Sequence, residues 1–154
     1  MARLAVGDKG PQFTLLDQDG ESVSLGDFVG RRVVVYFYPA DDTPGCTKEA
    51  CQFDAALYRF VGAGVEVLGI SPDGSESHRR FRDRYELKLR LLSDENHSVM
   101  EAYGAWGEKT LYGRKSVGVI RSTFLLSHDG TIERAWYNVR ADGHAEKVLA
   151  AVPD

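Results

Sequence analysis

The sequence predicts an α/β protein whose central sheet is parallel in part. Two uninterrupted runs rich in β-branched and aromatic residues, 32–38 and 65–70, have the composition of strands buried on both faces of a sheet. Apolar residues at helical spacing fill residues 44–61 between them, so these elements form a right-handed parallel crossover. Two further apolar runs, 119–127 and 131–137, are separated by a short turn and predict an antiparallel pair.

A β-hairpin is expected before the first buried strand. Residues 13–16 and 22–25 are short strand-like runs, and the polar turn between them ends in Gly20. Pro39 ends the first buried strand, because proline cannot donate a hydrogen bond to a neighbouring strand. The helix that follows has its apolar side chains at Ala50, Phe53, Leu57, Tyr58 and Val61, and we expect these to form its buried face.

The second half of the chain adds a helix, an insertion and a closing helix. A helix is predicted over residues 75–86, and we interpret its charged run, 78–84, mainly as solvated surface. The insertion follows with a short strand at 89–92, a short helix at 97–103 and a long loop at 104–118 that carries Trp106. A helix over residues 143–151 ends the chain. From residue 32 onward this order is that of the thioredoxin-like fold, with an N-terminal β-hairpin extension and an insertion after the second core helix.

The composition indicates one globular domain spanning residues 1–154, without repeats or linkers. Hydrophobic residues make up 43% of the chain, and its net charge of -4 gives no reason to expect nucleic acid or an anionic membrane as a partner. The first ten residues lack the apolar segment of a secretory signal, and no apolar run is long enough to span a bilayer. Two cysteines are too few for a disulfide scaffold, so we expect a cytoplasmic protein whose cysteine pair is catalytic or redox-active.

Cys46 lies where local structure favours a reactive thiolate. Pro44 suits the first position of a helix, which makes Thr43 the N-cap and puts Cys46 in the first helical turn. Free backbone N–H groups and the positive end of the helix dipole both favour the thiolate there. Gly45 allows a small substrate to approach the backbone, where the amides of Gly45 and Cys46 can hold its oxygens. The alternative is an inert, buried cysteine.

The residues around Cys46 also resemble a known family. Pro39-x-x-x-Thr43-x-x-Cys46 is similar to the active-site signature of peroxiredoxins. The longer run from Tyr36 through Cys46 to Cys51 resembles the subfamily called bacterioferritin comigratory protein, or peroxiredoxin Q. The resemblance covers nearly the whole chain and extends to the following segments: 17–20, 67–71, 92–94 and 106–109.

The resemblance implies a thiol-dependent peroxidase with Cys46 as the peroxidatic cysteine, which attacks a peroxide oxygen and becomes a sulfenic acid. Thr43 would direct its hydroxyl at the thiolate and the peroxide, although a plain N-cap explains this residue equally well. Pro39 would shape the loop and shield Cys46 from water, although its role as a strand terminator requires no function. Cys51 would be the resolving cysteine, which condenses with the sulfenic acid to give an intramolecular disulfide; a buried apolar cysteine is the alternative.

Two charged residues complete the site that the resemblance implies. Arg121, in the run Ile120-Arg121-Ser122-Thr123-Phe124, matches the family's catalytic arginine, whose guanidinium stabilises the thiolate and the leaving oxygen. Without the family, an arginine within a strand usually faces solvent. Glu49 matches the acidic residue that orients this arginine, although it also suits a surface position on the helix. Asp42 departs from the family, since many relatives carry a bulkier apolar residue there, and this leaves the peroxide preference open.

The implied substrates are hydrogen peroxide and organic hydroperoxides, reduced without a cofactor or metal. Thioredoxin is the expected reductant, with glutaredoxin as the second candidate, and we expect a monomer. A thioredoxin-like disulfide reductase or redox adaptor is the main alternative, although its usual Cys-x-x-Cys motif is missing. A zinc site is disfavoured because the four histidines are far apart in the sequence. Residue order alone leaves a cysteine–histidine hydrolase open.

Overall fold

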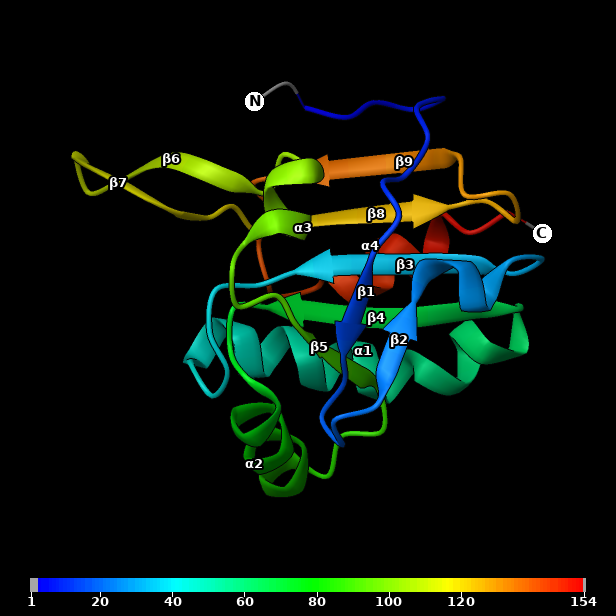
Figure 1. The fold of residues 1–154 in the computed structure, drawn as a ribbon, viewed down its shortest axis with the longest axis horizontal. Coiled ribbons are helices and arrows are strands. Elements are labelled where there is room, and N and C mark those ends of the chain that lie inside the picture. The colour runs from blue at the N-terminus through cyan, green and yellow to red at the C-terminus, as the bar shows by residue number, and fades with distance from the viewer. Residues whose placement is uncertain (1–2, 154) are drawn as a thin grey trace.

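The computed structural model describes residues 3–153, and this part of the chain is built around a seven-stranded sheet (Figure 1). The strands in chain order are β1 (Thr14–Leu16), β2 (Ser22–Ser24), β3 (Arg32–Phe37), β4 (Val65–Ser71), β5 (Arg90–Ser93), β8 (Ser122–Leu126) and β9 (Ile132–Tyr137). Across the sheet they follow the order β2-β1-β5-β4-β3-β8-β9. The strands β3, β4 and β5 run parallel, whereas β8 is antiparallel to both β3 and β9. The predicted crossover and the predicted antiparallel pair are therefore confirmed.

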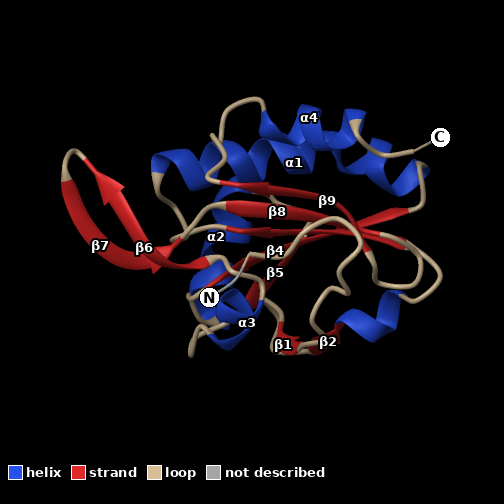
Figure 2. Ribbon diagram, turned by 90° about the horizontal axis from the view of Figure 1, so that it is seen from above, coloured by secondary structure: helices blue, strands red, loops and turns tan. Residues whose placement is uncertain are grey.

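Helices cover both faces of this sheet. They are the 3-10 helix η1 (Leu25–Phe28) and the α-helices α1 (Pro44–Gly62), α2 (Ser75–Tyr85), α3 (Ser98–Ala102) and α4 (His144–Ala150). Figure 2 shows α1 and α4 side by side on one face, with α3, η1 and the β1–β2 hairpin on the other. Among the described residues, no helix is long and apolar enough to cross a membrane.

Two apolar clusters fill the space on either side of β3. Val33, Val35 and Phe37 point into the cluster shared with η1 and α3, while Val34 and Tyr36 point into the one shared with α1 and α4. All five side chains are buried. From Val33 onward the strand is thus built of β-branched and aromatic residues because neither face contacts water there, as the unbroken run predicted.

The order β3-α1-β4-α2-β8-β9-α4 confirms the thioredoxin-like fold, with β1 and β2 as the N-terminal extension. The insertion after α2 contains β5, α3 and two further strands, β6 (Trp106–Leu111) and β7 (Arg114–Val119). The prediction of a loop over residues 104–118 is therefore wrong, because most of it forms this hairpin. Figure 1 shows the hairpin projecting beyond the main sheet, where exposed strands need no alternating apolar pattern. Tyr112 and Gly113, both at positive φ, form its two-residue turn.

Three smaller expectations also change. Tyr58 and Val61 are 75% and 57% exposed, so they do not belong to the buried face of α1; Phe60 does. The predicted strand over 119–127 is divided, because β7 ends at Val119 and β8 begins only at Ser122. The charged run 78–84 is mostly solvated as expected, but His78 at its start is fully buried.

Candidate active site

The start of α1 lies just beyond the carboxyl end of β3, where open α/β sheets place their ligands. Thr43 is the N-cap of α1 and Pro44 its first residue, as the sequence predicted. The first helical hydrogen bond runs from Thr47 N to Thr43 O at 2.8 Å. The amides of Gly45 and Cys46 precede this bond and lack helical partners. Cys46 thus lies in the first turn, with only 1% of its surface exposed.

Arg121 reaches this turn from the neighbouring strand of the sheet, because β8 pairs with β3. It lies in the break between β7 and β8, and its Nη2 donates a hydrogen bond to Cys46 Sγ at 3.4 Å. Its Nη1 donates to Glu49 Oε1 at 2.5 Å, one helical turn after the cysteine. A Cβ at Gly45 would lie 3.4 Å from Arg121 Nη2, so glycine leaves room for the guanidinium. The structure therefore brings together four residues that the sequence singled out.

Glu49 is fully buried rather than on the helix surface. Burial raises the pKa of Glu49 to about 7, although the charge and hydrogen bond of Arg121 act in the opposite direction. Burial alone would lower the pKa of Arg121, but Glu49 and Cys46 raise it above its ordinary value. Arg121 thus keeps its positive charge beside the Cys46 sulfur.

Cys51 lies five residues after Cys46 on the same helix, and both thiols are free. It is half-buried and packs against the apolar cluster beneath α1. Burial, and secondarily the charge of Asp54, raise the pKa of the Cys51 thiol. Cys51 therefore remains a thiol more readily than an ordinary surface cysteine.

The remaining residues singled out by the sequence, Pro39 and Thr43, lie in the loop between β3 and α1. Thr43 is exposed, and its hydroxyl donates to the carbonyl oxygen of Ala40 at 2.9 Å instead of pointing its proton at the sulfur. Pro39 is half-buried just after β3. A shallow hollow of about 430 Å³ adjoins the helix start; its lining consists of Pro44, Gly45, Lys48, Arg140, Ala141 and Asp142.

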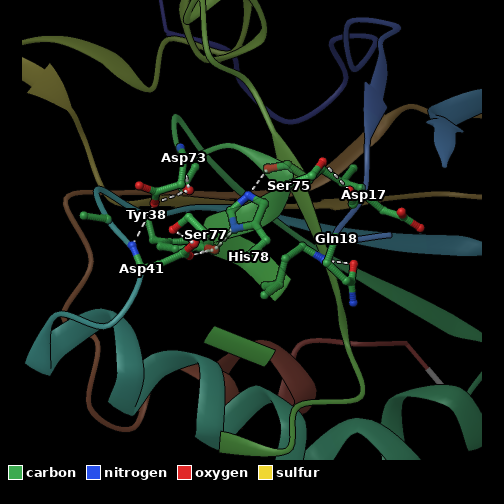
Figure 3. A network of polar contacts seen from close by, with 12 residues as sticks. Asp17, Gln18, Tyr38, Asp41, Asp73, Ser75, Ser77 and His78 are labelled. Carbon is green, nitrogen blue, oxygen red and sulfur yellow. Dashed lines mark hydrogen bonds and ion pairs between the residues drawn. The ribbon is translucent and has the colours of Figure 1, made fainter. Parts of the chain in front are cut away.

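A buried polar network beside the site was not predicted. Figure 3 shows His78 of α2 against Asp41, which lies in the loop between β3 and Thr43. His78 Nδ1 is 2.7 Å from Asp41 Oδ2, and Tyr38 OH donates to Asp41 Oδ1 at 2.6 Å. His78 Nε2 is 3.0 Å from the carbonyl oxygen of Leu92, so this nitrogen carries a proton. The spacing of His78 and Phe81 on one face of α2 was the available signal for its burial.

Three residues of this network are of the types that bind metal ions. Asp41, Asp73 and His78 have ligand atoms within 4.8 Å of one another. However, Asp73 Oδ2 already accepts hydrogen bonds from Asp41 N at 2.7 Å and from Ser71 Oγ at 2.8 Å. Asp41 is likewise occupied by its neighbours. The group is therefore satisfied as a hydrogen-bond network, and we do not assign a metal to it.

A thioredoxin-like fold that holds a buried thiol between a helix N-terminus and a guanidinium is the architecture of a thiol peroxidase. Comparisons with known proteins agree. Residues 6–135 match the AhpC/TSA family. A protein of Mycobacterium tuberculosis named as a peroxiredoxin is 56% identical over 146 residues, which cover 95% of this chain and 93% of that protein. Peroxiredoxin Bcp of Escherichia coli is 46% identical over 149 residues, which cover 97% and 96% of the two chains.

Solved structures lead to the same family. PrxQ of Xylella fastidiosa matches with a TM-score of 0.91 and 32% identity, covering 97% of this chain and 96% of that one. Bacterioferritin comigratory protein of Xanthomonas campestris matches with a TM-score of 0.86 and 39% identity, covering 91% and 89%. The chain therefore belongs to the AhpC/TSA family and is a peroxiredoxin, an oxidoreductase that acts as a peroxidase.

Proposed function

We propose that this peroxiredoxin reduces hydrogen peroxide and organic hydroperoxides with Cys46 as its nucleophile. The observation that carries the proposal is the Arg121 guanidinium 3.4 Å from Cys46 Sγ, in the first turn of α1. The Xanthomonas campestris relative, whose structure title refers to alkyl peroxide reduction, supports organic hydroperoxides as substrates. A hollow also adjoins Gly45, the residue directly before Cys46 in the chain.

The first step transfers one oxygen atom to the cysteine. The Cys46 thiolate attacks the terminal oxygen of ROOH, the O–O bond breaks, and RO⁻ leaves and takes a proton. Cys46 is oxidised to a sulfenic acid and the peroxide is reduced to an alcohol, or to water when R is hydrogen. The guanidinium of Arg121 opposes the negative charge on the sulfur and on the leaving oxygen throughout the step.

The residues around Cys46 orient the peroxide. We infer that the amides of Gly45 and Cys46 donate to a peroxide oxygen, because neither has a partner within α1. The Thr43 proton is engaged by Ala40, so the Thr43 oxygen is available to accept a hydrogen bond from the peroxide hydroperoxyl group. Pro39 limits the access of water from the side of β3. Glu49 holds the guanidinium in place through Nη1, which leaves Nη2 directed at the sulfur.

The second step consumes the sulfenic acid. Cys51 Sγ attacks Cys46 Sγ, a disulfide forms, and the hydroxyl of the sulfenic acid leaves as water with the Cys51 proton. In an ideal helix, Cα atoms of residues five apart are about 8.7 Å apart, beyond the limit of about 7 Å for a disulfide without backbone movement. Both cysteines lie within α1, so its first turns have to unwind before the disulfide closes.

A dithiol then returns the enzyme to its starting state. We propose thioredoxin as the reductant, in a cytoplasmic setting: its two thiols become a disulfide while Cys46 and Cys51 regain theirs. The family supports a reductant of this type. Opening of α1 also makes the disulfide accessible to a second protein, which an intact helix would prevent.

Single-turnover kinetics of two serine variants test the assignment. Cys46→Ser should consume no peroxide, because a serine hydroxyl is not appreciably ionised at neutral pH. Cys51→Ser should consume about one equivalent and then stop at the sulfenic acid or overoxidise. Mass spectrometry should find the 46–51 disulfide in the unmodified protein, and thioredoxin should remove it. If Cys51→Ser reacts no faster than Cys46→Ser, the two roles are wrongly assigned.

A further inference from the structure

Two side chains of α2 hold the residue that directly precedes the N-cap of α1. Arg84 Nη1 donates to Asp42 Oδ2 at 2.6 Å, and Tyr85 OH donates to Asp42 Oδ1 at 2.7 Å. Tyr85 also lies near Thr47, the residue after Cys46. We call the contacts of Asp42 with Arg84 and Tyr85 the Asp42 latch. The latch joins the last turn of α2 to the residue just before the N-cap of α1.

The backbone conformation of Asp42 depends on the contacts of the latch. Asp42 has φ of +60°, in the left-handed region that residues other than glycine seldom occupy. Such a conformation persists only where the surroundings hold it. The hydrogen bond from Tyr85, followed by those of Arg84, lowers the pKa of Asp42, so both contacts are made to a carboxylate.

Both ends of the cysteine-bearing segment are anchored to the same side of the fold. Before it, Asp41 belongs to the buried network with α2 (Figure 3). After it, Asp54 Oδ1 accepts hydrogen bonds from Lys88 N at 2.6 Å and Leu89 N at 3.0 Å, in the loop that follows α2. The stretch between these anchors, residues 43–53, contains both cysteines and is the part of α1 that has to unwind.

We propose that Asp42, Arg84 and Tyr85 are positioning residues that set how often this segment opens. With the latch closed, Cys46 stays in the first turn of α1 beside the guanidinium, in the form that reacts with peroxide. With the latch released, Cys46 approaches Cys51 and the disulfide forms. This inference rests on the proposed roles of the two cysteines and adds the residues that balance their two reactions.

The latch acts unequally on the two reactions. The disulfide step requires the open form, which is the minor one, so its rate rises in proportion to the open population. The peroxide step requires the closed form, which stays the major one and so changes little. A residue of the peroxide-binding machinery would affect mainly the peroxide step. A residue that merely stabilised the fold would not alter the balance between the two steps.

The test compares the unmodified protein with the double variant Arg84→Gln/Tyr85→Phe, which removes both donors and leaves Asp42 in place. Disulfide formation, followed by rapid acid quenching and mass spectrometry, should accelerate by about fivefold. The peroxide step should change by less than about twofold. A second peroxide competes with Cys51 for the sulfenic acid, so half-maximal overoxidation of Cys46 should require about fivefold more peroxide.

Arg80→Gln is the matched control, because Arg80 lies on the same helix in an exposed pair with Glu76; both rates should stay unchanged. Asp42→Asn weakens the latch from its other side, and asparagine tolerates the left-handed backbone. It should also accelerate disulfide formation and should add little to the double variant. Variants of Asp54 are less decisive. Besides burial, the charge of Asp54 raises the pKa of Cys51, so these variants would also change the reactivity of the Cys51 thiol.

An unchanged disulfide rate in both the double variant and Asp42→Asn would overturn the inference. A parallel loss of both rates would also overturn it, because it would indicate a general weakening of the fold. Failure of the proposed function would look different, since Cys46→Ser would then consume peroxide as fast as the unmodified protein.

Discussion

Glu49→Gln is expected to change how the stability of the protein depends on pH. Burial raises the pKa of Glu49 from 4.5 to about 7, so the folded protein holds a proton on this carboxyl group that the unfolded chain releases. Between these two values the native state binds more protons than the unfolded state, and the free energy of unfolding falls as pH rises. The contribution of Glu49 is fully present below about pH 4.5 and is lost as pH passes through about 7.

The size of the effect follows from the two pKa values. They differ by about 2.5 pH units, and each unit corresponds to about 1.36 kcal/mol. The protein should therefore lose on the order of 3 kcal/mol of stability over this range relative to Glu49→Gln, whose amide does not titrate. Glutamine still accepts a hydrogen bond from Arg121 and has nearly the same volume as glutamate. The substitution can also change the free energy of unfolding by an amount that does not depend on pH. Such an offset does not affect how the stability difference between the two proteins varies with pH.

Urea unfolding at several pH values between about 4.5 and 8 measures this difference. Both proteins are compared in a Cys46→Ser background, so that ionisation of this thiol does not contribute. The stability of Glu49→Gln relative to glutamate should improve steadily with pH and level off above about pH 7. A difference that does not vary with pH would refute the reasoning, because Arg121 would then offset the burial of Glu49 completely.

Three further predictions concern catalysis. Arg121→Ala should slow the peroxide step by roughly 10²-fold and slow alkylation of Cys46 by less, because the guanidinium also acts on the leaving oxygen; equal losses in the two reactions would limit Arg121 to the thiolate. Thr43→Val should slow the peroxide step by about tenfold while Thr43→Ser retains it, since only serine keeps the hydroxyl; equal rates for the two variants would exclude a role for the Thr43 oxygen. Oxidation should accelerate hydrogen exchange of amides 46–53 while 33–37 stay protected; a disulfide form with α1 intact would contradict the unwinding.

Local patterns were enough to predict most of the fold. The strand β3 is an unbroken run of β-branched and aromatic residues after Arg32, α1 has apolar residues at helical spacing, and Pro39 and Pro44 mark the boundary between them. The β6–β7 hairpin could not be predicted in this way, because it lies outside the main sheet and buries little of its surface. Its turn, Tyr112-Gly113, also lacks the Asn-Gly or Asp-Gly sequence that usually marks a two-residue hairpin turn.

The candidate site was predictable where a motif surrounds the residue and less so elsewhere. Cys46 and Thr43 lie in one continuous motif, and the structure places them at the start of α1 as expected. Burial of Glu49 was harder to predict, since a charged residue normally stays on the surface unless a partner compensates it. That partner, Arg121, is 72 residues away in the sequence. The pairing of Asp41 with His78 was missed for the same reason, because it joins two segments that only the folded sheet brings together.

The register of the sheet explains why Arg121 meets Cys46. Phe37, the last residue of β3, pairs with Ser122, the first residue of β8, so Arg121 lies opposite the first residue of the loop that leads to α1. Side chains alternate along a strand, and Leu125 points into the cluster shared with α1 and α4, while Thr123 contacts His144 of α4. Arg121 has the same parity and therefore points to the same face. A slip of one residue between β3 and β8 would turn the guanidinium to the opposite face of the sheet, away from both Glu49 and the sulfur. The pairing of β3 with β8 thus also places the charge beside Cys46.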